Sequence, residues 1–305
     1  MQSKTGTLDA VEPYDFDRSL DFLQGFGPMS GEQSVEGGSA TKAIMAEGRV
    51  VAVRVRKGKK AATVDYELFS VEPISSKLAD SMQDRTSFFL SLKDDVKPFY
   101  SIAKDKDPKF YPIIERAWGL HQVKFPSFLE IACWALINQR IQRPIALRIK
   151  RSLTEKYGGS IEVDGKVYWA FPDRSRLEGS SAKELLELTR NQRITQRLVS
   201  LTSMLEELDE GFLKTAPFDK AKERLERVRG VGEWSSQFIL FRGLGRMGRL
   251  QQINLRPLGE TIEKVYGPEG RSPEEVNKTY GSWAGYWSLY LWASTMAPSG
   301  HPELV

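Results

Sequence analysis

The sequence predicts an α+β domain over residues 1–105, followed by an all-helical region over residues 106–305. Two patterns predict this order. In the stretch VVAVRVRKGKKAATVDYELF, apolar and polar residues alternate on both sides of a basic turn at residues 57–60, which is typical of an antiparallel β-hairpin. Beyond residue 107, apolar residues recur at steps of three and four, which is typical of amphipathic helices. A length of 305 residues suffices for two domains.

The remaining elements are predicted from the same patterns. In the first domain we expect a helix over residues 14–26, strands within residues 33–70 and a helix over residues 74–92, with the glycine-rich stretch at 31–40 forming a loop. The second region shows no internal repeat. Its spacing predicts helices over residues 107–118, 126–140, 142–157, 180–189, 193–209, 218–228, 234–244, 255–266, 273–280 and 283–296.

Composition narrows the class of protein. A charged fraction of 28% and a hydrophobic fraction of 40% are ordinary for a soluble chain, and the N-terminus lacks the apolar run of a signal peptide, so we expect a cytoplasmic protein without a membrane partner. The single cysteine, Cys133, excludes an internal disulfide and is expected in the core. Neither His121 nor His301 has a partner at metal-ligand spacing, so we expect no metal and no cofactor. The net charge of +4 is compatible with a polyanion partner.

A glycine turn at residues 229–234 joins two of the predicted helices, 218–228 and 234–244. Gly230 and Gly232 permit positive φ and a close backbone approach, so successive N–H groups and the N-terminus of the second helix can converge on one anion. The turn therefore predicts a phosphate-binding site. From these residues alone, an ordinary helix-ending turn is the alternative.

Several segments resemble one family. The stretches at 125–158 (FPSFLEIACWALINQRIQRPIALRIKRSLTEKYG) and 227–245 (RVRGVGEWSSQFILFRGLG), together with 13–23 and 281–292, resemble 3-methyladenine DNA glycosylase II, the alkylation-repair branch of the helix-hairpin-helix DNA glycosylase superfamily. The resemblance implies that the N-terminal domain is an antiparallel sheet like that of the TATA-binding protein. It also implies two helical lobes with the DNA lesion bound in the cleft between them.

The resemblance assigns the DNA contacts. The amides of Gly230 and Gly232 would hold phosphate oxygens, with added charge from Arg229 and Arg242. The residue that fills the gap in the base stack follows a glutamine in a turn between two helices, which corresponds here to Gln139 and Arg140. The family has an aliphatic residue at this position, whereas the guanidinium of Arg140 would stack on bases. The alternative is that Arg140 is a helix-terminal charge.

The resemblance also assigns the base pocket. Trp234, Phe238 and Trp283 match its aromatic positions, and electron-poor alkylated purines stack on such rings. Periodicity alone would place Trp234 and Phe238 in the core. Relatives that form a Schiff base have a lysine at position 234, so the tryptophan implies a monofunctional enzyme.

The family's catalytic aspartate lies twenty residues beyond the hairpin aromatic, and this position is Asn254. No acidic residue occurs from 234 to 259, and losing one preorganised electrostatic group costs about 2.7–4 kcal/mol. Three explanations stay open: an engineered Asp-to-Asn change, a non-cleaving lesion binder, or an enzyme for labile substrates. The third explanation includes a substitute carboxylate such as Glu260 or Glu263. Rescue by Glu260 is disfavoured, because that residue is expected on the next helix and away from the sugar.

The preferred hypothesis is a monofunctional glycosylase that flips and excises alkylated purines in base excision repair. It predicts double-stranded DNA with alkylated bases or abasic sites as the partner, a monomeric state and an association with the nucleoid. The competing hypothesis is a pseudo-glycosylase that binds damaged DNA or abasic sites without cleavage. A third hypothesis is a general helix-hairpin-helix DNA-binding protein. It would explain the phosphate-binding hairpin, but it would leave the aromatic residues at positions 234, 238 and 283 unexplained.

Overall fold

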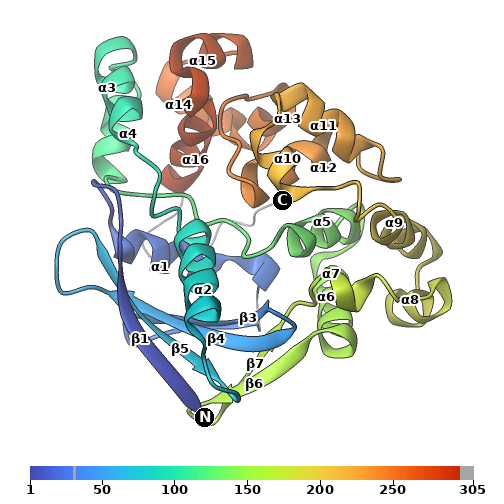
Figure 1. Ribbon diagram of the computed structural model, residues 1–305. Coiled ribbons are helices and arrows are strands. Elements are labelled where there is room, and N and C mark those ends of the chain that lie inside the picture. Colours follow the sequence, from blue (N-terminus) through green and yellow to red (C-terminus); the bar gives the residue numbers. More distant parts are fainter. Residues whose placement is uncertain (30–31, 296–305) are drawn as a thin grey trace.

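The computed structural model describes residues 1–29 and 32–295. It confirms the predicted fold class: a small antiparallel sheet is followed by a mainly helical region (Figure 1). The sheet has five strands in the order β1-β5-β4-β3-β2. These are β1 (Gln2–Asp9), β2 (Gln33–Glu36), β3 (Ser39–Ala46), β4 (Arg49–Lys57) and β5 (Thr63–Ser70).

The predicted hairpin is the pair of β4 and β5, in which Ala52 lies opposite Phe69 and Lys57 opposite Val64. The stretch 31–40, predicted to be a loop, instead contains β2 and the start of β3. Gly37 and Gly38 both have positive φ, 55° and 73°, as a two-residue hairpin turn requires. The edge strand β1 was not predicted, because its side chains are mostly exposed and polar and leave no apolar alternation.

Helices α1 (Phe16–Gly25) and α2 (Ser76–Phe89) contribute to the main hydrophobic core together with one face of the sheet. The helices of the second region are α3 (Lys97–Lys106), α4 (Tyr111–Arg116), α5 (Phe128–Ile137), α6 (Arg143–Tyr157), α7 (Arg174–Leu177), α8 (Ala182–Thr189), α9 (Gln192–Ser203), α10 (Glu210–Thr215), α11 (Phe218–Glu226), α12 (Glu233–Phe238), α13 (Gln252–Leu255), α14 (Gly259–Tyr266), α15 (Pro273–Tyr280) and α16 (Ala284–Ser294). The helix predicted over 193–209 ends at residue 203.

The sequence predicts an all-helical second region, but the structure contains two strands there. Strands β6 (Gly159–Val163) and β7 (Lys166–Ala170) form a hairpin whose turn, Asp164-Gly165, has φ values of 50° and 76°. Asp-Gly between alternating apolar residues is a strong hairpin signal, and here it interrupts a stretch that is otherwise helical. The hairpin covers the second face of the sheet through a small core of eight residues: Ala43, Met45, Ala52, Phe69, Ile161, Val163, Tyr168 and Ala170. The division at residues 105 and 106 stays a prediction.

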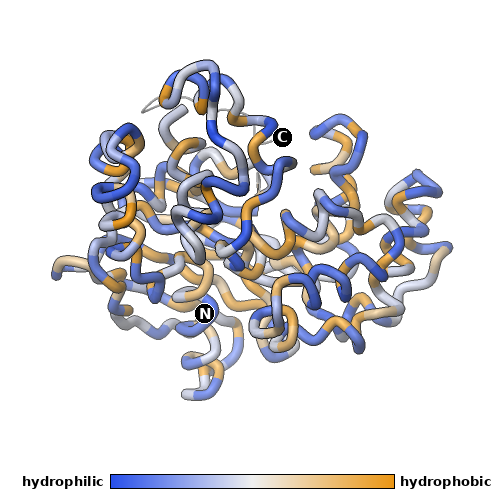
Figure 2. The backbone as a smooth tube through the Cα atoms, turned by 90° about the horizontal axis from the view of Figure 1, so that it is seen from above, coloured by the Kyte–Doolittle hydropathy of each residue, from blue (hydrophilic) through white to orange (hydrophobic). Residues whose placement is uncertain are grey.

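The helices form two groups with separate cores. Helices α5, α6, α8, α9, α11 and α12 share the main core, whereas α3, α4, α14, α15 and α16 surround a second core rich in aromatic residues (Figure 1). The π-helical turn Ile239–Gly243 joins them, because Leu240 belongs to the first core and Phe241 to the second. Hydrophilic stretches follow the outer turns of both groups (Figure 2). No helix within residues 1–29 and 32–295 combines the length and apolarity needed to cross a membrane.

The structure also shows where the single cysteine and one of the two histidines lie. Cys133 is buried in α5, all ten residues of which are buried, and this confirms its predicted core position. His121 is fully buried, and its Nδ1 and Nε2 lie 2.7 Å and 2.9 Å from the carbonyl oxygens of Ser91 and Pro13. The ring therefore ties the loop before α1 to the end of α2. His301 lies outside the described residues.

Candidate functional site

The hairpin between α11 and α12 contains the two glycines singled out in the sequence. Gly230 has a φ of 92°, and a Cβ atom there would lie 2.6 Å from Cγ of Arg197, so both the conformation and the space require glycine. Gly232 has an ordinary φ of −111°, which corrects the expectation of a second left-handed residue. Nothing lies within 4 Å of a Cβ atom built at Gly232, so the backbone is open to a close approach from outside.

The backbone amides of this hairpin differ in their availability. The N–H of Arg229 donates to Oγ of Ser200 at 2.9 Å and is therefore occupied. Within the part of the chain that the structure describes, the N–H groups of Gly230 and Gly232 have no protein acceptor, and both residues are exposed. They lie at the N-terminus of α12, where the helix dipole favours an anion. The side chain of Arg229 is also exposed beside them.

The turn between α5 and α6 is held against this hairpin by one side chain. Nε2 of Gln139 lies within hydrogen-bonding distance of three acceptors: the carbonyl oxygens of Ala135 and Gly230, at 3.0 Å and 2.9 Å, and Oγ of Ser235, at 2.8 Å. The next residue, Arg140, is exposed and has a φ of 56°, in the left-handed region. The structure therefore brings Gln139 and Arg140 next to the hairpin, as the resemblance implies.

A second arginine on α9 supports the same junction. Nη1 of Arg197 donates to the carbonyl oxygen of Leu136 at 3.1 Å, and its aliphatic stem packs over Gly230. Burial and the nearby charges of Arg193 and Arg140 lower the pKa of Arg197. Three guanidinium groups thus gather where α9 meets the α5–α6 turn. Sequence analysis missed Arg193 and Arg197 because they lie more than fifty residues from the turn and belong to no recognised motif.

A cavity of ≈ 150 Å³ lies where the two helical groups meet. The rings of Trp234 and Phe238 line it and are stacked, with centroids 5.1 Å apart and planes inclined by 9°. Asn254 lines the same cavity, so three of the predicted site residues come together. The complete lining is Gln122, Trp234, Phe238, Phe241, Arg242, Met247, Asn254, Pro257, Leu258, Gly285, Ser288, Leu289 and Trp292. A cavity of about this volume can hold one benzene-sized ring.

Trp283 does not line this cavity, although the resemblance assigned it there. Its ring packs on Tyr286 at a centroid distance of 5.5 Å, and another tryptophan of the C-terminal segment, Trp292, lines the cavity instead. Trp292 also packs edge-on against Phe22 of α1, with centroids 5.5 Å apart. The first domain therefore supports one wall of the cavity.

Two polar side chains in the lining have atoms without partners. Nε2 of Gln122 donates to the carbonyl oxygen of Phe241 at 2.9 Å, but its buried Oε1 accepts no hydrogen bond from the described residues. The guanidinium of Arg242 lies 4.8 Å from the ring centre of Phe22, and its Nη2 is buried without a partner. Burial lowers the pKa of Arg242 to about 10, so the group stays protonated at neutral pH. Sequence analysis missed Gln122, which belongs to none of the matched segments.

Asn254 is fixed by its own helix. It lies in the short helix α13 and is half-buried, and its Oδ1 accepts a hydrogen bond from the N–H of Gln251 at 2.8 Å. Its Nδ2 donates no hydrogen bond to the described residues, and Oδ1 keeps a second lone pair, so either atom can contact a ligand. Glu260 and Glu263 are exposed on α14, and neither lines the cavity. The structure thus offers no support for a substitute carboxylate from these two residues.

Comparisons with known proteins show which proteins share this sequence and fold. No family model matches the chain. The DNA-3-methyladenine glycosylase of Bacillus subtilis (strain 168) is 28% identical over 211 residues, which cover 67% of this chain and 69% of that protein. The solved structure of 3-methyladenine DNA-glycosylase from Archaeoglobus fulgidus is similar with a TM-score of 0.74, at 19% identity over 95% of this chain and 98% of that one. The chain therefore has the fold of a 3-methyladenine DNA-glycosylase and is similar in sequence to a protein named DNA-3-methyladenine glycosylase.

A further superfamily structure shares the whole fold. The 8-oxoguanine glycosylase/lyase of Clostridium acetobutylicum, solved with double-stranded DNA containing cytosine opposite 8-oxoguanine, is similar with a TM-score of 0.66 and 18% identity, over 97% of each chain. The superfamily resemblance predicted from the sequence is therefore confirmed. The roles of the individual site residues stay predictions.

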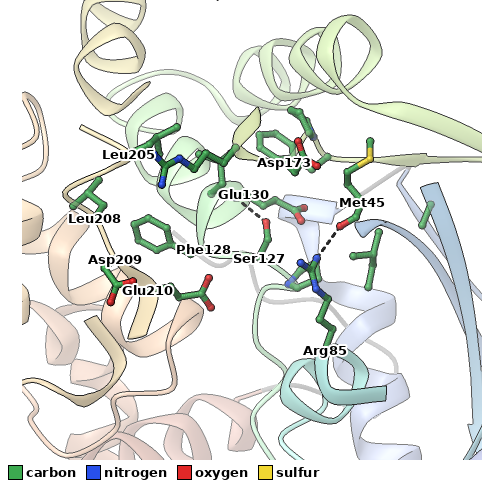
Figure 3. A pocket seen from close by; sticks show the side chains of 17 residues that line it. Met45, Arg85, Ser127, Phe128, Glu130, Asp173, Leu205, Leu208, Asp209 and Glu210 are labelled. Carbon is green, nitrogen blue, oxygen red and sulfur yellow. Dashed lines mark hydrogen bonds between the residues drawn. The ribbon is translucent and has the colours of Figure 1, made fainter. Parts of the chain in front are cut away.

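A larger cavity of ≈ 300 Å³ lies between the sheet and the helices of this glycosylase fold (Figure 3). Its polar side chains already have partners. Arg85 donates to the carbonyl oxygen of Met45 at 2.7 Å, Glu130 accepts from Lys150 at 2.8 Å, and Asp209 caps α10. We assign no ligand to this cavity.

Proposed function

We propose that the protein is a monofunctional DNA glycosylase that binds damaged duplex DNA, flips one nucleotide into the cavity lined by Trp234 and Phe238, and hydrolyses its N-glycosidic bond. The observation that carries this proposal is the stacked pair of rings beside Asn254, at the position that follows the DNA-gripping hairpin. A flipped base is held by stacking and by hydrogen bonds to its edge. Trp234 cannot form a Schiff base, and water is therefore the proposed nucleophile.

The hairpin supports a grip on the DNA backbone. The N–H groups of Gly230 and Gly232 have no acceptor within residues 1–29 and 32–295, and a phosphate oxygen would satisfy them at the N-terminus of α12. Arg229 adds an exposed positive charge at the same edge. Contacts of this kind position the protein without reading sequence, and binding through them weakens as salt concentration rises.

Arg140 is proposed to occupy the gap that the flipped nucleotide leaves. Its left-handed conformation and exposure project it from the turn, and Gln139 anchors that turn to the hairpin. The charge of Arg197 repels its guanidinium, so insertion between bases would move it away from a like charge.

The chemistry at residue 254 differs from that of a carboxylate. When the bond between C1′ and the base nitrogen breaks, positive charge develops on the sugar, which a carboxylate stabilises and an amide does not. With Oδ1 engaged by the N–H of Gln251, Nδ2 of Asn254 can position a water molecule but cannot accept its proton. We therefore infer base release that is slower than with an aspartate.

The substrate class follows from the relatives. The Bacillus subtilis and Archaeoglobus fulgidus proteins are both named for 3-methyladenine, so alkylated purines are the first substrates to test. The experiment incubates the protein with methylated duplex DNA under single-turnover conditions and measures free 3-methyladenine and 7-methylguanine by chromatography. Release above the uncatalysed rate supports the proposal. A rate equal to that of buffer alone, with protein in excess, would contradict it.

A second candidate function is binding to damaged DNA without cleavage. The neutral Asn254 favours it, because the cavity retains its aromatic walls and the hairpin its amides while the expected carboxylate is missing. This function predicts tighter binding to a duplex with an abasic analogue than to the intact duplex, and no base release. One set of labelled duplexes distinguishes the two functions, with binding and release measured on the same samples.

A further inference from the structure

The segment that leads to Asn254 is tied to α15 by one side chain. Oδ1 of Asn277 accepts from the N–H of Leu250 at 2.8 Å, and its Nδ2 donates to the carbonyl oxygen of the same residue, also at 2.8 Å. An asparagine side chain offers an acceptor and a donor side by side, so Asn277 bonds Leu250 as a neighbouring β-strand would. The two bonds fix both the position and the rotation of this stretch of backbone.

The carbonyl group of Leu250 and the N–H of Gln251 belong to the same peptide bond. This N–H donates to Oδ1 of Asn254 at 2.8 Å, and the N–H of Asn254 donates to the carbonyl oxygen of Gln251 at 2.9 Å. A trans peptide bond is planar, so its carbonyl oxygen and its N–H point in opposite directions. By holding the carbonyl oxygen, Asn277 therefore determines where the N–H points, and this N–H holds Asn254.

Helix α15 is a rigid support for Asn277. It begins with a capping box, in which the N–H of Glu275 donates to Oγ of Ser272 at 3.2 Å and the N–H of Ser272 donates to Oε2 of Glu275 at 2.8 Å. Val276 and Tyr280, on either side of Asn277 in the chain, are buried in the second core. Asn277 is thus presented by a fixed element and not by a loop.

The same bonds determine which end of the Asn254 amide faces the peptide. The N–H of Gln251 requires an acceptor, so the amide cannot exchange its two ends without losing this bond. A carbonyl group that accepts a hydrogen bond also polarises its peptide bond and strengthens the bond that the N–H donates. The bond from Asn277 to Leu250 therefore stabilises one orientation of a residue that lines the cavity.

We propose that Asn277 is a positioning residue, which sets the orientation of the side chain at position 254 through the peptide bond between Leu250 and Gln251. Asn277 itself does not line the cavity that the described residues form. The consequence for base release rests on the proposed function, because it requires that a flipped nucleotide enters the cavity. The orientation of Asn254 is measurable without DNA.

Nuclear magnetic resonance of the free protein tests the positioning. In Asn277→Ala, the N–H of Gln251 should exchange with solvent about fivefold faster than in the wild type, and the side-chain amide resonances of Asn254 should shift. Lys278→Ala is the matched control, because Lys278 is exposed on the same helix, and it should leave both observations unchanged. Wild-type exchange and wild-type resonances in Asn277→Ala would overturn the inference.

A second variant separates the donated bond from the anchoring of the segment, and it also serves if Asn277→Ala does not fold. Asn277→Asp keeps an acceptor for the N–H of Leu250, but an ionised carboxylate cannot donate to the carbonyl oxygen. Protonation of the new carboxyl restores a donor. The ratio of the exchange rates of Gln251 in the variant and the wild type should therefore fall towards one as the pH decreases. A ratio that does not change with pH would contradict the role of the donor.

The rate of base release tests the consequence for the reaction. Asn277→Ala should slow the single-turnover release of 3-methyladenine by about tenfold, because a misdirected group loses its effect on the reacting atoms. Its affinity for an abasic duplex should stay unchanged. In Asn254→Ala, where no amide is left to orient, adding Asn277→Ala should have no further effect on the rate. An equal effect of Asn277→Ala in both backgrounds would overturn the inference.

The two measurements keep this inference apart from the proposed function. Altered resonances of Asn254 in Asn277→Ala, with no base release by any of the proteins, would contradict the proposed glycosylase activity alone. Base release by the wild type, together with unchanged exchange and resonances in Asn277→Ala, would contradict the inference alone.

Discussion

Nε2 of Gln139 lies 2.9 Å from the carbonyl oxygen of Gly230, so a single side chain couples the turn after α5 to the hairpin between α11 and α12. The two residues are ninety-one positions apart in the chain. The proposed stack-filling residue, Arg140, follows Gln139 directly. The coupling therefore fixes the distance between the part that would hold the DNA backbone and the part that would enter the base stack.

Replacing Gln139 tests this coupling. Gln139→Ala removes the donor and leaves the carbonyl oxygen of Gly230 to water, so we expect binding to a duplex with an abasic analogue to weaken by about 1 kcal/mol, roughly fivefold. The affinity is measured by fluorescence anisotropy. Gln142→Ala is the control, because Gln142 is exposed on the same turn and makes no side-chain cap bond. Equal affinities of the two variants would show that the coupling does not matter for binding.

Arg140 can act as a stack-filling residue or as a simple charge, and two variants distinguish these roles. If it fills the stack, Arg140→Ala should weaken binding to the abasic duplex more than to intact DNA, and Arg140→Leu should restore the difference. If it only contacts phosphate, both duplexes should lose affinity equally and the salt dependence should fall by about one counterion. Arg148→Ala, an exposed residue of α6, is the control. A full salt titration of each variant separates the two outcomes.

Replacing Asn254 with aspartate tests whether the missing carboxylate limits the rate of base release. In Asn254→Asp, an oxygen can still accept the bond from Gln251, so the fold of α13 should persist while the negative charge returns. We expect release of 3-methyladenine from methylated DNA to accelerate by about a hundred- to a thousandfold. Asn191→Asp is the control, since an aspartate caps α9 as well as the asparagine does. An unchanged single-turnover rate in Asn254→Asp would remove residue 254 from the catalytic site.

The residues that the resemblance assigned to the site and that do lie together are local in the chain. Trp234, Phe238 and Asn254 line one cavity and fall in one continuous stretch with the hairpin glycines, although periodicity alone would have placed the two rings in the core. The third aromatic residue was misplaced. Helix α16 is apolar on nearly all sides, so no periodicity indicated that Trp292 rather than Trp283 would face the cavity.

Long-range contacts could not be predicted in this way. Gln122 and Arg197 reach the site through tertiary packing, and neither belongs to a motif. Lys150 lies in a run of basic residues, a pattern typical of a solvated helix face, but it is fully buried. It bonds Glu130 and Glu32 at 2.8 Å and 2.5 Å, which only the packing of α6 against the sheet domain brings about.

From this buried ion cluster we predict how a substitution changes the free energy of unfolding. Glu130 lies between Lys150 and Lys42, at 2.8 Å and 3.7 Å. Glu130→Gln would leave two buried ammonium groups with Glu32 as their remaining acidic partner in the cluster, and we expect a loss of about 3–5 kcal/mol in the free energy of unfolding. The double variant Glu130→Gln with Lys150→Met restores charge balance and should be more stable than Glu130→Gln alone. Urea unfolding of the three proteins checks this order, which a purely steric effect would reverse.

The free energy of unfolding should depend on pH because of the same cluster. Burial alone would raise the pKa of Glu130, but the charges of Lys150 and Lys42 outweigh burial and hold the pKa below its ordinary value of 4.5. Below pH 4.5 the carboxylate of Glu130 therefore binds a proton in the unfolded chain but stays ionised in the folded protein. The free energy of unfolding falls as the pH decreases through this range. In the double variant this contribution is absent. We expect its free energy of unfolding to decline less steeply between pH 5 and pH 3 than that of the wild type, and parallel curves would contradict the role of Glu130.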